Sequence, residues 1–470
     1  MIFSSLFFLF VFLPFMLLIY YVVPWKIKNF VILVFSIVFY AWGEPVYVIL
    51  MIFSILINFV TGLELEQYKR ENNLRKRRMT LIFNIIVNLG ILGFFKYYGF
   101  FVENINKILP FDIPYKELAL PVGISFYTFQ TLSYIIDLYW GRVEVQRKLV
   151  DFAVYVTMFP QHIAGPIVRY ADVARQLASR QLSAIKFGEG CAWFLRGLGK
   201  KVIFANNIGA LYETIAALPA SETTVVTAWL GAIAYTFQIY FDFGGYSDMA
   251  IGLGKMLGFD FIKNFDYPYI SKSITEFWRR WHISLSTWFR EYVYIPLGGN
   301  RVSVAKHIRN IMIVWLLTGF WHGAAWNFML WGIYYGVLLL LEKYILKDFL
   351  ARIPSIAQHI YAMVFVIIGW VFFFSTSVSS AMGYIGHMFG IGTGGFLNAQ
   401  TIYYLRNYGI LMILMVICSG PALYNKYKKT VFGRGGWRLY LSLALYILLF
   451  IVVIAFLVNA TYNPFLYFRF

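Results

Sequence analysis

The stretch IFSSLFFLFVFLPFMLLIYYVV, residues 2–23, carries no charged side chain. At about 1.5 Å per residue, a helix of this length covers the roughly 30 Å of hydrocarbon in a bilayer. The stretch has neither the basic flank nor the small-residue cleavage site of a secretory signal peptide, so we expect it to be retained as a membrane span. It therefore predicts a protein that lies in a membrane.

The composition of the whole chain agrees with this prediction. Of its 470 residues, 60% are hydrophobic and only 13% are charged, whereas a soluble domain is about half apolar and about a quarter charged. The two cysteines, Cys191 and Cys418, provide no disulfide framework and no thiolate metal cluster. Lys and Arg number 40 against 22 for Asp and Glu. In a membrane protein this excess indicates loops that face anionic lipid, and not a nucleic-acid partner.

Other apolar segments follow along the chain, among them Ile308–Leu341. They predict an all-α, polytopic membrane protein in which roughly ten to twelve membrane and re-entrant helices share one interior. The basic stretch between Glu64 and Thr80 predicts a cytoplasmic loop, because short loops rich in Lys and Arg stay on the cytoplasmic side. Counting back from this loop places the N-terminus on the extracytoplasmic side.

A single histidine interrupts the long apolar segment, in the run Trp315-Leu-Leu-Thr318-Gly319-Phe-Trp321-His322-Gly323-Ala-Ala-Trp326. A charged side chain at membrane depth costs about 2.5–3.5 kcal/mol or more, so His322 indicates a functional site. On one helix, Thr318 and Trp326 would share its face. Gly319 and Gly323 would let another helix or a narrow substrate approach the backbone. The alternative is a histidine that only hydrogen-bonds between helices.

A second polar run extends from Ser273 to Arg301. Ser273 and Glu276 match a capping box, so we expect a helix to begin there. Its two faces would differ: Phe277, Trp281, Leu285 and Trp288 on one, and Arg279, His282 and Ser286 on the other. Such an amphipathic helix is typical of a membrane surface or a water-filled cavity. The alternative is an interfacial helix without chemistry.

A third run, Asp242-Phe-Gly-Gly-Tyr-Ser-Asp248, places two carboxylates around a glycine pair. Paired carboxylates can bind a metal or exchange protons, but no His or Cys follows at ligand spacing, so we expect no metal site. We expect a helix break at the glycines, capping, and ion pairs with Arg279 or Arg290.

General base catalysis fits a lone buried histidine, because neutral imidazole accepts a proton at physiological pH. The sequence contains no Gly-x-Ser-x-Gly nucleophile elbow and no Walker-type phosphate loop. A covalent intermediate would need an activated nucleophile beside the histidine. These absences favour direct transfer of a group between two bound substrates.

Together with two further motifs, these runs resemble the membrane-bound O-acyltransferase family, and within it the branch that acetylates bacterial polysaccharides such as alginate. The motifs are Leu120-Pro-Val-Gly-Ile-Ser-Phe-Tyr-Thr-Phe-Gln130, Ala164-Gly-Pro-Ile167, Asp242–Asp248, Trp281–Ser286 with Tyr294-Ile-Pro-Leu-Gly-Gly-Asn300-Arg301, and Trp321-His322-Gly323. By this resemblance 1–470 is one domain, with N-terminal spans in 1–118, a catalytic core in 119–341 and C-terminal spans in 342–470.

The resemblance implies roles for particular residues around a central tunnel. His322 matches the family's essential histidine and would accept a hydroxyl proton. His282 matches a second motif position near it and would position a thioester or its developing oxyanion. The further substrate-binding or tunnel-lining candidates are Trp321, Thr318, Trp326, Ser286, Asn300, Asp242 and Asp248. Glu291 departs from the family pattern, in which we expect Asp.

The resemblance also implies the substrates and the setting. The donor would be an acyl thioester, acetyl-CoA or a carrier-linked acyl group, with no bound cofactor and no metal. The acceptor would be a hydroxyl on the outer side of the bacterial inner membrane. Implied partners are membrane lipid, an extracytoplasmic SGNH-type acyltransferase and a polysaccharide pathway. D-alanyl transfer to lipoteichoic acid is an alternative, and so is a transporter or flippase, although the chain shows no inverted repeat.

Overall fold

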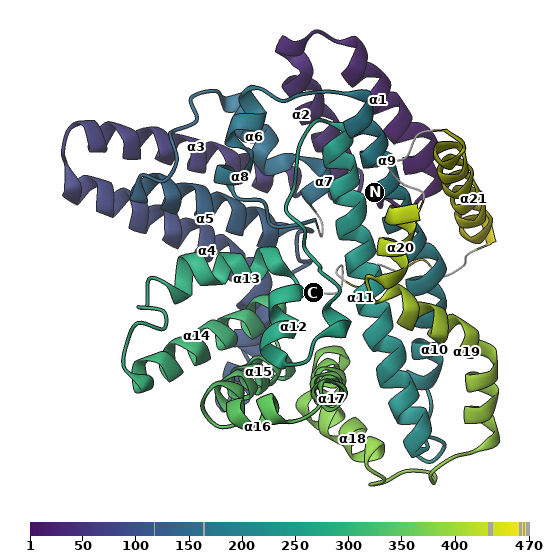
Figure 1. The fold of residues 1–470 in the computed structure, drawn as a ribbon. Coiled ribbons are helices and arrows are strands. Elements are labelled where there is room, and N and C mark those ends of the chain that lie inside the picture. The colour runs from purple at the N-terminus through teal and green to yellow at the C-terminus, as the bar shows by residue number, and fades with distance from the viewer. Residues whose placement is uncertain (117, 163–164, 431–435, 460–462, 464–465, 467–470) are drawn as a thin grey trace. The chain divides into compact units, whose positions relative to one another are not determined.

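The computed structural model describes residues 1–116, 118–162, 165–430, 436–459, 463 and 466. Ala164, which begins one of the motifs above, lies outside them. The described part is helical and contains no strand (Figure 1). The all-α class is therefore confirmed. The chain divides into two compact units, residues 1–194 with 249–262 and residues 195–248 with 263–470.

The first unit holds the N-terminal helices and a set of shorter ones. They are η1 (Phe8–Phe12), α1 (Leu13–Val22), α2 (Trp25–Ala41), α3 (Val48–Arg70), α4 (Leu74–Asn106), α5 (Ile124–Trp140), α6 (Leu149–Thr157), α7 (Phe159–His162), α8 (Tyr170–Ala178) and most of α9 (Ala184–Gly199). The predicted span over residues 2–23 is shorter in the structure, as an apolar helix over Phe8–Val22.

The second unit contains the three polar runs. Its elements are η2 (Lys200–Ala205), α10 (Asn206–Ala216), most of α11 (Val225–Met256), η3 (Pro268–Ile270), α12 (Ile274–Arg280), α13 (Ile283–Phe289), η4 (Arg290–Tyr294), α14 (Val304–His322), α15 (Trp326–Tyr344), α16 (Lys347–Arg352), α17 (Ser355–Phe374), α18 (Val378–Met388), α19 (Ala399–Cys418), α20 (Ala422–Thr430) and α21 (Trp437–Asn459).

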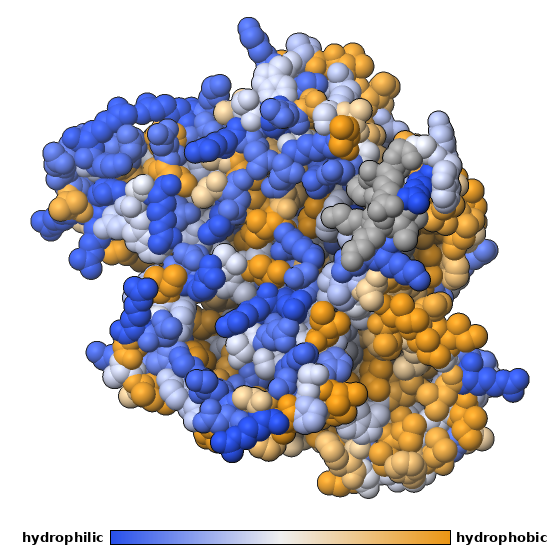
Figure 2. Space-filling model, viewed as in Figure 1, coloured by the Kyte–Doolittle hydropathy of each residue, from blue (hydrophilic) through white to orange (hydrophobic). Residues whose placement is uncertain are grey.

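Within the described residues, five helices are long and apolar enough to cross a membrane: α3, α4, α17, α19 and α21. Several of them leave large apolar side chains exposed, as Ile402, Ile410, Ile413 and Val416 do on α19. Figure 2 shows hydrophobic side chains gathered over α19 at the lower right. Because contact with lipid tails needs such a surface, the polytopic membrane class predicted from the sequence is also confirmed.

The basic stretch of the first unit is not a loop. Helix α3 continues to Arg70, and α4 begins at Leu74 after a short turn. Asn73 caps α4, because its side-chain oxygen accepts a hydrogen bond from the Lys76 amide at 3.0 Å. The predicted loop from Glu64 to Thr80 is therefore wrong: all of its basic side chains lie on the ends of two helices.

The long apolar segment Ile308–Leu341 is also not one helix. Gly323 adopts an extended conformation, so α14 ends at His322 and α15 begins at Trp326. After this short connection, α15 packs against α14 (Figure 1). A Cβ atom on Gly319 would lie 2.3 Å from the Phe328 carbonyl oxygen. The prediction that Gly319 lets another helix approach is therefore confirmed, and that helix is α15.

We expect the Gly319→Ala variant to be destabilised by about 1–3 kcal/mol, because the added methyl group must push α14 away from the α15 backbone. The measurement is thermal unfolding of the protein in detergent. Gly409→Ala is the matched control, since a Cβ at Gly409, within α19, meets nothing within 4 Å. Equal melting temperatures for the two variants would contradict the role of Gly319.

Candidate active site

His322 is the last residue of α14 and is buried. Three aromatic rings surround its imidazole at nearly perpendicular angles: Trp321 at 5.0 Å, Trp331 at 5.1 Å and Phe373 at 5.2 Å between ring centroids. Trp331 lies on α15 and Phe373 on α17. The tight packing of α14 on α15 therefore brings a polar ring into an aromatic enclosure.

Of the two residues predicted to share a helix face with His322, one lies on the same helix and the other begins the next helix. Thr318 is buried one turn before it on α14, where its hydroxyl donates to the Val314 carbonyl at 2.7 Å. Trp326 is 56% exposed and begins the next helix. The predicted common face with Trp326 is wrong, because the chain leaves the helix at Gly323.

His282 does not lie on a continuous amphipathic helix, so that prediction is wrong as well. The helix breaks between α12 and α13, and His282 takes the left-handed conformation with φ of 45°. Asn264 supports this break. Its backbone carbonyl accepts from the Ile283 amide at 2.9 Å, and its side-chain oxygen accepts from the Ser284 amide at 3.2 Å and from the Ser284 hydroxyl at 2.9 Å.

The same side-chain oxygen of Asn264 indicates which ring nitrogen of His282 carries the proton. The His282 Nδ1 atom lies 3.3 Å from it. This oxygen also accepts from the Ser284 amide and can only accept, so the neutral form of His282 that hydrogen-bonds here is the one protonated on Nδ1. Neutral His282 then has its lone pair on Nε2. Asn264 was not identified from the sequence, since nothing in its neighbourhood distinguishes it.

The three polar runs meet around His282. The ring of Phe243, from the run with two aspartates, lies 4.8 Å from the His282 ring, and the Trp321 ring lies 6.1 Å from it. Trp321 also contacts His322 at 5.0 Å. One tryptophan therefore borders both histidines, and the tertiary structure joins segments that the sequence keeps some 40 residues apart.

The two aspartates form ion pairs, but not those expected. Helix α11 passes through Gly244 and Gly245 without a break. Asp242 binds Lys201 Nζ at 2.6 Å and accepts from the Leu466 amide at 2.9 Å. Asp248 binds Lys200 Nζ at 2.7 Å.

Arg290, one of the two expected partners, pairs with another carboxylate, and Gly245 has a role in packing. Arg290 binds Glu291 at 3.0 Å, so the pairing predicted for it is wrong. A Cβ on Gly245 would lie 2.7 Å from the Gly197 carbonyl oxygen. Gly245 thus allows the segment that carries Lys200 and Lys201 to pack closely on α11, and the glycine pair does not break the helix.

Ser286 and Asn300 are both exposed, in contrast to the buried histidines. The Ser286 hydroxyl donates a hydrogen bond to the Trp278 carbonyl at 3.5 Å, and the Ser286 amide donates to the His282 carbonyl at 3.1 Å. The turn that contains Asn300 is held by Asn310, whose amide donates to the carbonyls of Leu297 and Gly299, each at 3.1 Å. Among the described residues, no hydrogen bond joins the side chain of Ser286 or Asn300 to the ring of His282 or His322.

Glu342 holds the start of α12, the helix that leads to His282, and the sequence did not reveal this role. It is buried near the end of α15, and its carboxylate accepts from the Ile274 amide at 2.6 Å and the Thr275 amide at 2.8 Å. Ser273 caps the same helix start by accepting from the Glu276 amide at 2.9 Å, so the predicted beginning of α12 is confirmed. A carboxylate suits the positive end of a helix dipole.

The fold and this site define a polytopic membrane protein with two histidines buried among aromatic rings. The described residues contain no group of three or more His, Cys, Asp or Glu side chains arranged to hold a metal ion.

Comparison with known proteins gives the family. A sequence model of the membrane-bound O-acyltransferase family matches residues 143–385. A probable alginate O-acetylase of Azotobacter vinelandii is 43% identical over 425 residues, which cover 89% of this chain and 84% of that protein. The chain belongs to the membrane-bound O-acyltransferase family. It is therefore an O-acyltransferase, which uses an acyl donor as co-substrate.

Two other relatives show the breadth of the similarity. A peptidoglycan O-acetyltransferase of Helicobacter pylori is 34% identical and aligns over 83% of this chain and 80% of its own length. A teichoic acid D-alanyltransferase of Bacillus subtilis is 32% identical and covers only 50% of this chain and 63% of that protein.

We expect Lys201→Met to destabilise the protein by about 3–5 kcal/mol, because it leaves the buried Asp242 carboxylate without its ion-pair partner. Lys200→Met is the matched control. Its pair with Asp248 is more exposed, at 27% and 13% of the two side chains, so its loss should cost about 1 kcal/mol or less. Thermal unfolding in detergent measures the stability of both variants. Similar destabilisation by the two substitutions would contradict the stronger role assigned to the Lys201–Asp242 pair.

Proposed function

We propose that the protein transfers an acetyl group from a cytoplasmic thioester to a hydroxyl of a cell-surface polysaccharide. The relatives that cover most of the chain carry names of O-acetyl transfer to alginate and to peptidoglycan. The observation that supports the proposal is that the rings of both buried histidines lie close to the Trp321 ring, His282 at 6.1 Å and His322 at 5.0 Å between centroids. Acetyl-CoA or a carrier-linked acetyl group would serve as the donor.

In this proposal His322 is the general base. Its imidazole takes the proton of the acceptor hydroxyl while the oxygen attacks the thioester carbonyl. The new C–O bond forms, the C–S bond breaks, and the thiolate leaves with the proton returned by the imidazolium. The three rings about 5 Å from the imidazole support the exclusion of water, which would otherwise hydrolyse the thioester.

His282 is proposed to hold the acceptor hydroxyl. With its proton on Nδ1, neutral His282 offers the lone pair of Nε2, which accepts a hydrogen bond from a hydroxyl. This tautomer cannot donate from Nε2 to a developing oxyanion, so it favours binding of the acceptor over stabilisation of the thioester oxygen. Asn264 is then a positioning residue for His282.

We also infer the setting of the reaction, from the basic stretch between α3 and α4 and from the family resemblance. It comprises a place in the bacterial cytoplasmic membrane, an extracytoplasmic N-terminus, and a tunnel through which donor and acceptor reach the histidines from opposite sides. An extracytoplasmic SGNH-type acyltransferase would carry the acetyl group onward to the polymer.

D-alanyl transfer to teichoic acid is the second candidate. It is favoured by the D-alanyltransferase relative, which aligns with half of this chain. It is weaker because the O-acetylase relatives are more similar and align over more of the chain.

We expect His322→Ala to lower acyl transfer by about 10²- to 10⁴-fold, the usual contribution of a general base. The measurement is alkali-released acetate and D-alanine from surface polymers of cells that express each variant in place of the native protein. His387→Ala, a substitution on α18, is the control. Acetate near the wild-type level in correctly inserted His322→Ala would refute the proposal, whereas selective loss of D-alanine esters would support the second candidate.

We expect Asn264→Leu to lower kcat with little change in the KM of the acyl donor, because it removes the group that orients His282 without touching the substrate. Asn264→Asp keeps an acceptor for Nδ1 and should retain more activity. The readout is the initial rate of thioester consumption in membranes at varied donor concentration. If both variants raised the donor KM and left kcat unchanged, the positioning role would be wrong.

A further inference from the structure

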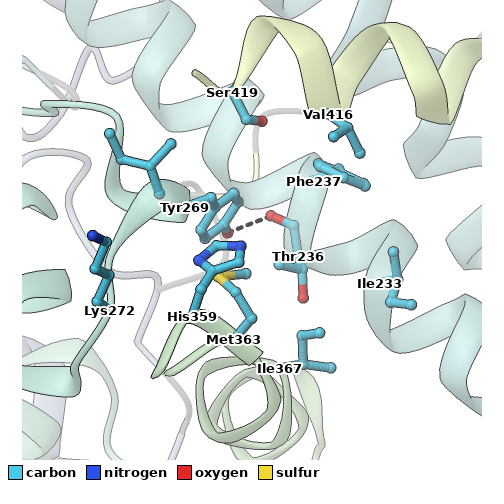
Figure 3. A pocket seen from close by; sticks show the side chains of 11 residues that line it. Ile233, Thr236, Phe237, Tyr269, Lys272, His359, Met363, Ile367, Val416 and Ser419 are labelled. Carbon is cyan, nitrogen blue, oxygen red and sulfur yellow. Dashed lines mark hydrogen bonds between the residues drawn. The ribbon is translucent and has the colours of Figure 1, made fainter. Parts of the chain in front are cut away.

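A pocket of about 440 Å³ lies in the second unit, and neither His282 nor His322 lines it. This volume is in the range of about 300–1,000 Å³ that small-molecule sites occupy. Figure 3 shows side chains from α11, α17 and α19 around it. Its walls are largely apolar and include Ile233, Phe237, Met363, Ile367 and Val416.

The hydroxyl groups on the pocket wall are already engaged within the protein. Thr236 donates to the Ala232 carbonyl at 2.7 Å, and Ser419 donates to the Met415 carbonyl at 2.8 Å. Tyr269 donates to the Thr236 carbonyl, the bond drawn in Figure 3. These hydroxyl groups therefore do not need a hydrogen-bond acceptor from a ligand, and this part of the pocket suits an apolar group.

The remaining polar side chains, Lys272 and His359, give the pocket a positive end. His359 Nδ1 lies 3.0 Å from the Ser271 carbonyl oxygen and donates to it, which leaves Nε2 for other contacts. Lys272 is exposed, and within the described part of the chain its ammonium group forms no ion pair. The nearby Glu276 carboxylate binds Arg280 at 2.9 Å. Charge complementarity thus calls for an anionic group at this end.

The apolar part of the pocket follows a membrane helix. His359, Met363 and Ile367 are spaced four residues apart, so they follow one face of α17 for about 12 Å. Both α17 and α19 are long and apolar enough to cross a membrane. The pocket therefore begins near the end of a span, at a cationic side chain, and continues along apolar side chains into the span.

We propose that this pocket binds an anionic phospholipid, with one acyl chain along α17 and the phosphate beside Lys272. The apolar walls, the volume and the single positive end match that chemistry, and a membrane supplies it. Bound lipid would contact Tyr269, whose ring stacks on Trp281 at 6.1 Å, directly before His282 in the chain. The lipid site itself does not depend on the proposed reaction.

The experiment is native mass spectrometry of the purified full chain, titrated with phosphatidylglycerol and with phosphatidylcholine of the same acyl chains. Wild type should bind phosphatidylglycerol more tightly. Lys272→Gln should weaken that binding about fivefold, the effect of one lysine near a lipid surface, and leave phosphatidylcholine unchanged. Met363→Trp, which fills the pocket, should abolish both. Lys306→Gln removes an exposed charge elsewhere and should bind as wild type does.

Phosphatidylglycerol with a photoreactive acyl chain shows directly where the lipid binds, because it should label the α17 peptide that contains Met363. If Met363→Trp fails to fold, Ile233→Phe fills the pocket from α11 instead. Equal affinity for the two lipids, a filled pocket that still binds lipid, or labelling confined to other helices would each overturn the proposal.

Discussion

The contact between the backbones of α14 and α15 is the constraint on which the site depends. Gly319 and Gly332 lack side chains where these helices meet, and a Cβ on either would lie 2.3 Å from a carbonyl oxygen of the other helix. Between helices in a bilayer the hydrophobic effect contributes little, so close van der Waals packing of small residues must hold them together. That packing seats Trp331 against His322.

The same helix pair also fixes the second histidine. Glu342, near the far end of α15, binds the start of α12, the helix that leads to His282. Asn264 then holds the break after α12. Because an unsatisfied polar group is costly in a low-dielectric interior, these buried acceptors restrict the backbone to one arrangement. The two histidines are thereby placed by one connected set of contacts.

Residue types alone did not distinguish structural polar groups from chemical ones. Asp242 and Asp248 look like a carboxylate pair in the sequence, yet each is bound to a lysine of the segment that packs on Gly245. The buried pair of Asp242 with Lys201 balances two charges that the interior could not hold singly. His282 and His322, in contrast, lie among aromatic rings, and the ring of Trp321 is close to both of them.

The sequence by itself determined the membrane class, the helical content, the start of α12 and the glycine approach on α14, because these depend on local composition, capping and spacing. It also marked both histidines. Only the tertiary structure decided where helices end within apolar runs, as at Gly323 and His282, and which charges pair, as Lys201 with Asp242. Those outcomes depend on contacts between residues distant in the chain, and periodicity in one segment carries no information about them.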